Sequence, residues 1–354
     1  MTQQTTGQTP GQAPGQATGQ AAPRVARGAG GPRATRAPRV RAHGERFALL
    51  GAWALVLAVF CVLRPDTYAT AGNLQSVLGS QAVLLIVSLG VLLPLTTGEF
   101  DLSVASTLSL SAMVTAVLNV QHGWGIGTAV LAGVGSALVV GLANAVGVVR
   151  FGIPSFIVTL GSGTFALGVV QWISGQSSVT GIDPALVSAT VGSRFLGVPL
   201  QFYAALLAAV VLALVLEFTP LGRRLLFVGR SPKVAELSGF AVDRLRAGAF
   251  LGASLIAGLA GVVYAGALGG ADPSSGQSFL LPAFAAAYLG ATAIVPGRFN
   301  PIGTVVAVYF LSSGVVGLQM MGAQSFVQQL FYGGALVVAV GLSRYVRHRA
   351  AAAG

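Results

Sequence analysis

The chain has 354 residues, of which 54% are hydrophobic and only 8% are charged. Soluble domains carry about 25% charged residues, so this composition cannot supply a water-soluble surface. The net charge of +11 comes from basic residues outside the apolar runs, which indicates membrane topology and not nucleic-acid binding.

The N-terminal stretch, residues 1–46, is rich in Gly, Gln, Thr, Ala and Pro, then Arg, and has no apolar run. Such a stretch cannot bury a core, so we expect a disordered basic cytoplasmic tail. The first apolar run, 47–63, lacks a small-residue cleavage pattern. We therefore expect a retained membrane span and not a signal peptide.

A helix needs about 20 largely apolar residues to cross a bilayer. On that measure we predict an all-α polytopic membrane protein with about ten transmembrane helices, in a transmembrane domain over 47–345. We expect three segments to be short or broken. The segment 77–95 runs into Pro94, and the segments 278–294 and 327–342 are short. The ten predicted segments are 47–63, 77–95, 102–120, 126–149, 153–173, 199–218, 248–268, 278–294, 301–318 and 327–342.

The basic residues decide the expected orientation. With the N-terminus in the cytoplasm and alternating sides, only Arg64 and Arg194 of the 20 Lys and Arg residues fall outside. This bias follows the positive-inside rule. We predict cytoplasmic N- and C-termini, a cytoplasmic loop over 219–247 and a cytoplasmic C-terminal tail over 346–354.

Small residues recur at four-residue spacing in two of the predicted spans, from Gly133 to Ala145 and from Ala257 to Gly269. This spacing lets helix backbones approach closely, so these helices are expected to pack together. Low-complexity bias from an alanine- and glycine-rich proteome is the alternative.

Signatures of common enzyme sites do not occur in the sequence. The only lysine, Lys233, follows proline, so the end of a phosphate-binding P-loop is absent, and no Gly-x-Ser-x-Gly, paired-histidine or Cys-x-x-Cys motif is present. Cys61 stands alone, and His43, His122 and His348 are far apart without acidic partners. We expect no catalytic residue, no metal site and no cofactor, and therefore no enzyme activity.

Two carboxylates stand beside long apolar runs in Gly98-Glu99-Phe100-Asp101-Leu102-Ser103. Acids at such positions usually face a cavity or a partner. Asp101 could cap the third span by accepting backbone N–H groups, and the same element could line or gate a solute path. The two roles are compatible. The predicted pathway residues are Glu99, Asp101, Ser103, Asn144, Phe156 and Thr159.

The stretch 219–247 contains the signal of a short helix. Ser231 suits an N-cap, Pro232 the first helical position and Gly239 the stop. Val234 and Leu237 then share a face that another protein could contact. An ordinary positive-inside loop with a capped turn is the alternative.

From about residue 75 to 345 the chain resembles the ribose-type permease family of ABC importers. The matching motifs are the Gly-x-x-Asp-Leu-Ser element at 98–103, IPSFIVTLG at 153–161, TPLGRRLLFVG at 219–229, AELSGF at 235–240 and LIAGLAGVVYAG at 255–266. The stretch 281–304 fits less closely, because Gly290-Ala291 replaces a glycine pair. Glu99 and Arg230 also depart from the pattern.

The resemblance implies a multi-pass protein of the bacterial inner membrane that carries a sugar, either a pentose, a hexose or a related polyol, by alternating access. It implies three kinds of protein partner: a cytoplasmic ABC ATPase subunit, an extracytoplasmic sugar-binding protein and a second permease copy in a homodimer or heterodimer. The residues implied to contact the ATPase are Arg230, Ser231, Lys233, Val234, Glu236, Leu237 and Gly239.

Two other functions compete with sugar import. A branched-chain amino acid ABC permease also has many short spans and an arginine-rich cytoplasmic loop, but the Asp-Leu-Ser and Leu-Ser-Gly elements favour the sugar type. An ion-coupled secondary transporter is expected to carry ionisable groups in several spans, whereas Glu99 and Asp101 are nearly alone here.

Overall fold

The computed structural model describes the backbone of residues 39–352 and the side chains of residues 46–342. Most of the predicted N-terminal tail lies outside these residues. Its last part is helical, because α1 (Arg39–Leu63) begins before the expected position 47. Most of the predicted C-terminal tail is helical too, as the end of α14 (Ser325–Ala352).

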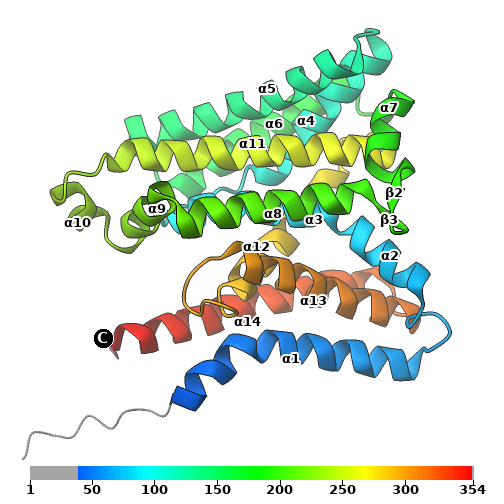
Figure 1. Ribbon diagram of the computed structural model, residues 1–354. Helices are drawn as coiled ribbons and strands as arrows, with labels where there is room; N and C mark the ends of the chain where they lie inside the picture. The colour runs from blue at the N-terminus through cyan, green and yellow to red at the C-terminus, as the bar shows by residue number, and fades with distance from the viewer. Residues whose placement is uncertain (1–38, 353–354) are drawn as a thin grey trace, which may run out of the picture. The chain divides into compact units, whose positions relative to one another are not determined.

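Within the described chain, nine helices are long and apolar enough to cross a membrane, which confirms the all-α polytopic fold. Figure 1 shows them as long, roughly aligned helices. Besides α1 and α14 they are α2 with α3 (Ala71–Ser80, Ala82–Thr96), α4 (Val104–Ala116), α5 (Ile126–Ala145), α6 (Ser155–Ser174), α8 (Leu200–Phe218), α11 (Val242–Leu268) and α13 (Pro301–Met320).

Short elements connect the long helices. Two π-helical turns, η1 (Val117–Gln121) and η2 (Val146–Arg150), extend α4 and α5. The other short helices are α7 (Pro184–Val187), η3 (Ser188–Gly192), α9 (Pro220–Arg230), α10 (Pro232–Leu237), η4 (Ser275–Phe279) and α12 (Leu280–Gly290). Two antiparallel strand pairs join β1 (Val179–Thr180) to β4 (Gly270–Ala271) and β2 (Arg194–Phe195) to β3 (Val198–Pro199).

The predicted eighth span, 278–294, is not a full crossing helix. It consists of the end of η4 and the 11-residue α12, which is too short to span a bilayer. Asn300 holds the turn that follows, because its Nδ2 donates to the carbonyl oxygens of Gly290 and Ala293, each at 3.1 Å. The expectation of a short segment was correct here, but it was wrong for 327–342, which belongs to the 28-residue α14.

The predicted break in 77–95 exists but lies elsewhere. It occurs at Gln81, between α2 and α3. Pro94 stands in the last turn of α3 and does not interrupt it, because the helix ends two residues later, at Thr96.

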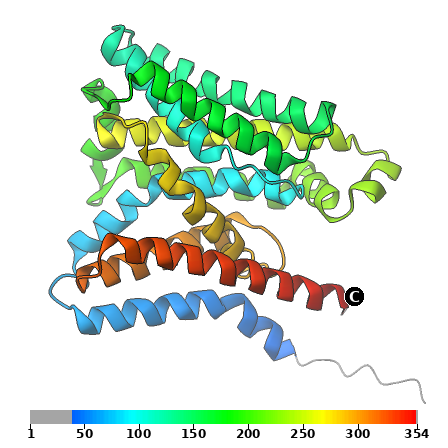
Figure 2. The same ribbon diagram turned by 180° about the vertical axis from the view of Figure 1, so that it is seen from behind.

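The centre of the helix bundle is α3, in which every residue is buried. Its sequence is apolar all round, as expected of a helix that contacts protein on every side. The neighbouring helices are α4, α8, α11, α12 and α13, and the two views in Figures 1 and 2 show α3 passing among them.

The predicted close packing of the glycine rows is confirmed for α4, α5 and α11. A Cβ atom added at Gly261 of α11 would lie 2.4 Å from the Leu108 carbonyl oxygen of α4. One added at Gly141 of α5 would lie 2.6 Å from Ser254 Oγ of α11. Side chains at these glycines would force the three helices apart.

The connections between helices gather at two opposite ends of the bundle. At one end, which we call the coupling face, Arg298 contacts Glu217 and the Ile294 N–H donates to the Arg46 carbonyl. Figure 1 shows α9, α10, the start of α1 and the end of α14 at this end, with α7, β2 and β3 at the other. The two ends of the described chain therefore share a side, although nine full spans alone would separate them, because the short α12 also carries the chain part of the way back between α11 and α13.

Candidate functional site

The predicted acidic element forms the connection between α3 and α4. Asp101, in its middle, is only 1% exposed. Asp101 Oδ1 accepts hydrogen bonds from the backbone N–H of Ser103 at 2.9 Å and from Ser103 Oγ at 2.6 Å. The other oxygen, Oδ2, is buried and has no hydrogen-bond partner among the described residues.

Asp101 is not the helix cap that the sequence predicted, because it lies two residues before the N-cap position of α4. Ser103 takes the N-cap position of α4 and makes no side-chain cap hydrogen bond. The backbone donor that Asp101 binds is that of Ser103 itself, before the first helical turn. Burial raises the pKa of the Asp101 carboxyl from 3.8 to about 6, although its hydrogen bonds from Ser103 oppose this shift.

A chain of polar side chains continues from Ser103 into α5 and α6. Asn144 Nδ2 donates to Ser103 Oγ at 2.8 Å, and Ser162 Oγ donates to Asn144 Oδ1 at 2.5 Å. Asn144 is fully buried, whereas Ser162, in the middle of α6, is half-buried beside the exposed side of that helix. We call Asp101, Ser103, Asn144 and Ser162 the polar relay. It joins three helices and reaches an outward side of α6.

The start of α6 fixes the backbone of the acidic connection. Ser155 Oγ accepts the N–H of Phe100 and Thr159 Oγ1 accepts the N–H of Leu102, both at 3.1 Å. An irregular segment must find such partners for its buried N–H groups. Thr159 therefore holds the acidic connection in place through its backbone.

Three of the six predicted pathway residues belong to the polar relay, and Phe156 lies apart from it. Its side chain is 54% exposed and lies on a side of α6 that nothing in the described chain covers, together with Leu160 and Gly161. It shares this exposed side with Thr164 and Gly168, so small and polar positions interrupt the apolar surface there.

Glu99 connects the acidic connection to α11. Its Oε1 lies 2.6 Å from Arg246 Nη2 and accepts a hydrogen bond from Arg246 Nε at 2.7 Å. Both side chains are largely buried. The predicted pathway residue Glu99 is thus an ion-pair partner of the segment that follows α10.

The predicted loop helix is α10, and its stop has the predicted form. Gly239 has a positive φ of 81°. The Gly239 N–H donates to the Glu236 carbonyl, and the Phe240 N–H donates to the Ala235 carbonyl, which is the Schellman arrangement. At the other end Ser231 occupies the predicted N-cap position and Pro232 the first turn, although the Ser231 side chain makes no cap hydrogen bond.

Apart from the buried Ala235, the side chains of α10 are exposed. Leu237 is 78% exposed, and Val234 is also exposed. Lys233 Nζ and Glu236 Oε2 form an exposed ion pair at 3.1 Å, which at the surface contributes little to stability. An apolar pair flanked by charges therefore stands free on the coupling face.

Sequence reasoning missed the helix that carries α10. The helix α9 begins at Pro220, and Thr219 Oγ1 accepts the N–H of Gly222. Thr219-Pro220 is the same N-cap and first-position signal that predicted α10. The end of α9 presses on α3: a Cβ added at Gly229 would lie 2.0 Å from the Thr96 carbonyl oxygen.

Two functional candidates were also missed. Ser162 follows Thr159 by three positions and so shares its side of a helix, which could have added it to the pathway set. Arg246 was counted only as a positive charge in a loop, and nothing in the sequence pairs it with Glu99. Within residues 46–342 no three His, Cys, Asp or Glu side chains are grouped to hold a metal ion.

Residues 73–340 match the sequence profile of a family described as branched-chain amino acid transport system / permease component. The chain belongs to this permease family. It is 32% identical to a probable ABC transporter permease of Sinorhizobium fredii, covering 89% of this chain and 94% of the relative. It is 31% identical to the ribose import permease of Bacillus subtilis, over 83% and 91%. It is 30% identical to the L-arabinose ABC transporter permease of Azospirillum brasilense, over 90% and 94%.

No solved structure matches the chain. The family and the nine candidate spans make it a multi-pass permease of the bacterial inner membrane, a component of a transporter and not an enzyme. The predicted resemblance to sugar importer permeases is confirmed by the relatives.

Proposed function

We propose that this permease carries a pentose, a hexose or a related polyol across the membrane as the membrane-spanning subunit of an ABC importer. The relatives named for ribose and L-arabinose support a sugar as substrate. The description of the family profile supports branched-chain amino acids as the second candidate. Because Lys233 follows proline and no P-loop is present, a separate ATPase subunit supplies the energy.

The observation that carries this proposal is the contact between the coupling face and the acidic connection that holds Asp101. The exposed α10 follows α9, whose Gly229 touches the end of α3. After α10, Arg246 binds Glu99, two residues from Asp101. A push on α10 therefore reaches the acidic connection from both sides, through packed backbone and through an ion pair.

The partner expected at α10 is the cytoplasmic ATPase subunit. Val234 and Leu237 offer an apolar contact, and Lys233 and Glu236 offer charges beside it. Docking of a short helix by its apolar side is a common mode of recognition. Closure of two ATPase subunits would then move α10 and switch the access of the solute path.

We place the solute path along the exposed side of α6, where a second permease copy completes it. Ser162 brings the polar relay to this side, so that a sugar hydroxyl could exchange a hydrogen bond with Ser162, which the buried Asn144 holds in place. Phe156 and Gly161 are exposed on the same helix. An extracytoplasmic binding protein would deliver the sugar at the end opposite the coupling face.

Reconstitution tests the proposal. The chain would be placed in proteoliposomes with the ATPase and binding protein encoded beside it, and uptake of labelled ribose, arabinose, allose and leucine would be measured. We expect ATP-dependent uptake of one of the sugars that a protonophore does not affect. Uptake of leucine alone would favour the amino acid importer, and ATP-independent uptake abolished by the protonophore would favour an ion-coupled transporter.

A further inference from the structure

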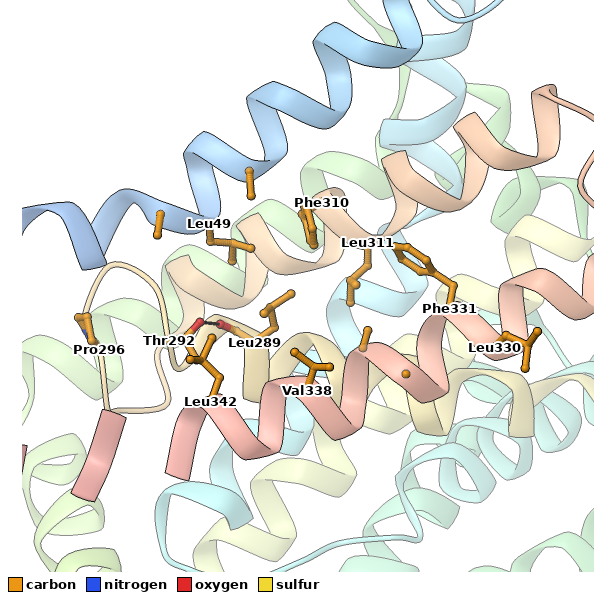
Figure 3. Close-up of a pocket in the computed structure, with 14 residues that line it drawn as sticks. Leu49, Leu289, Thr292, Pro296, Phe310, Leu311, Leu330, Phe331, Val338 and Leu342 are labelled. Carbon is orange, nitrogen blue, oxygen red and sulfur yellow. Dashed lines mark hydrogen bonds between the residues drawn. The ribbon is translucent and has the colours of Figure 1, made fainter. Parts of the chain in front are cut away.

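A large apolar cavity lies between α1, α13 and α14, away from the polar relay. Its volume is about 690 Å³. Figure 3 shows side chains from all three helices, among them Leu49, Phe310, Phe331 and Val338, directed toward it. The volume is large enough to hold several methylene groups of a flexible chain.

The lining excludes a polar solute. Thr292 contributes the one side-chain hydroxyl of the lining, and this hydroxyl donates to the Leu289 carbonyl at 2.7 Å. The cavity also lies between α1 and α14, whose spans are the least buried of the nine. It therefore opens toward the hydrocarbon of the bilayer, and its occupant must be apolar.

The cavity ends at the coupling face, where basic residues gather. Pro296 and Leu342 line this end. Arg46 stands beside it, because its carbonyl accepts the N–H of Ile294, and its exposed side chain forms no ion pair with a described residue.

In the sequence, further basic residues lie at the start of α1 and at the end of α14, outside the apolar spans. The first turns of α1 carry Arg39 and Arg41, and α14 continues beyond Leu342 with Arg344, Arg347 and Arg349. Glu45 is the only acidic residue in these two stretches. A molecule that fills the cavity thus ends beside Arg46 and next to two helix ends whose sequences are rich in arginine.

We propose that this cavity is a binding site for an anionic phospholipid, with an acyl chain between α1, α13 and α14 and the phosphate group at the arginines. Basic pockets between transmembrane helices bind anionic lipid headgroups by this combination of apolar burial and charge. The proposal is independent of the substrate of the permease.

Two other occupants fit less well. A second copy of this chain would bring the same arginines to the same face of a two-fold contact, so that like charges would oppose each other. The N-terminal residues 1–38 carry arginines and no apolar run, so they match neither the lining nor the charge.

Native mass spectrometry of the full chain with two lipids of equal acyl chains, dioleoyl phosphatidylglycerol and dioleoyl phosphatidylcholine, tests the site. Two adjacent valines of α14 give a matched pair, since Val338 lines the cavity and Val337 does not, and both are well exposed. We expect the wild type to bind the glycerol lipid at least five-fold more tightly than the choline lipid. V338W should weaken binding of the glycerol lipid at least five-fold, whereas V337W should leave it unchanged.

A second variant separates charge from apolar burial. Replacing Arg46, Arg344 and Arg347 by glutamine should abolish the preference for the glycerol lipid while both lipids still bind. Equal binding of the glycerol lipid to V338W and the wild type would overturn the proposal, as would an unchanged preference in the glutamine variant. Efficient disulfide cross-linking of V338C between copies in membranes, in a C61S background, would assign the cavity to a second copy instead.

Discussion

Arg246 places Nε and Nη2 at 2.7 and 2.6 Å from the same carboxylate oxygen of Glu99, across 147 residues of sequence. Glu99 begins the acidic connection that holds Asp101, and Arg246 lies in the first part of α11, just after α10. The ion pair therefore ties the segment that we expect to meet the ATPase to the segment that holds the polar relay.

The first prediction concerns this ion pair. Glu99→Gln and Arg246→Gln should each lower stability by about 1.5–3 kcal/mol, because hydrogen bonds to charged groups of this kind contribute that much. The double variant should lose less than the sum of the single losses. A double-mutant cycle from thermal unfolding in detergent measures this coupling.

In the assembled transporter the same variants should separate ATP hydrolysis from transport. We expect at least a ten-fold loss of uptake with ATPase activity largely kept, since the connection from α10 to the polar relay is weakened. Arg244→Gln is the matched control, because Arg244 is exposed on the same helix and forms no ion pair with a described residue. An equal loss of uptake in Arg244→Gln would contradict a specific role for the Glu99 contact.

The second prediction distinguishes the charge of Asp101 from its hydrogen bonds. Asp101→Asn keeps an oxygen that can accept the two hydrogen bonds from Ser103, so its Tm at pH 7.5 should equal or exceed that of the wild type. Asp101→Leu leaves the buried Ser103 N–H without this acceptor, which costs about 1–3 kcal/mol. A Tm of Asp101→Leu equal to that of the wild type would show that the hydrogen bonds are not needed.

The pH dependence has a defined sign. The pKa of Asp101 is raised in the folded protein from 3.8 to about 6, so folding favours the protonated carboxyl. The wild type should lose stability as pH rises from about 4 to about 6, and the loss should be complete above that range. Asp101→Asn lacks this titration, so its Tm relative to the wild type should rise over the same range in detergent.

The sequence predicted the buried part of the fold well, because long apolar runs with caps leave few alternatives. Asp101, Ser103 and Asn144 were found for a similar reason, since polar groups among apolar spans need partners. Short-range signals also placed the end of α10, where Gly239 adopts the positive φ that a helix stop favours.

Long-range pairings were beyond prediction from one sequence. A positive charge such as that of Arg246 is common in any cytoplasmic loop. Only the packing of α11 beside the end of α3 shows that Arg246 forms an ion pair with Glu99. The eighth segment failed for a different reason. Its hydropathy is continuous through 278–294, but the residues before it, which include Pro273 and two serines, do not extend the helix, so α12 stays short.

The third prediction is the orientation of the helix bundle. If the coupling face is cytoplasmic, a cysteine at the exposed Ser238 should react with a membrane-impermeant maleimide only after permeabilisation, in a C61S background. A cysteine at the exposed Ser193 should react in intact spheroplasts. The opposite labelling pattern would mean that the protein has the opposite orientation, with α10 on the extracytoplasmic side, where it could not contact a cytoplasmic ATPase.

The last prediction concerns docking of the ATPase at α10. Replacing Glu236 and Leu237 together by lysine should prevent assembly with the ATPase while membrane insertion stays normal, since both positions lie outside the spans. The change removes the partner of Lys233 and puts an ammonium group where we expect an apolar contact, and an unpaired charge at such a contact costs several kcal/mol. Leu221→Lys is the matched control, because Leu221 is exposed on α9 and adds a lysine near the same face without altering α10. Pull-down from membranes should recover the ATPase with the wild type and with Leu221→Lys but not with the double variant. Recovery of the ATPase at wild-type yield with the double variant would place docking elsewhere on the coupling face, near Arg150 or Arg298.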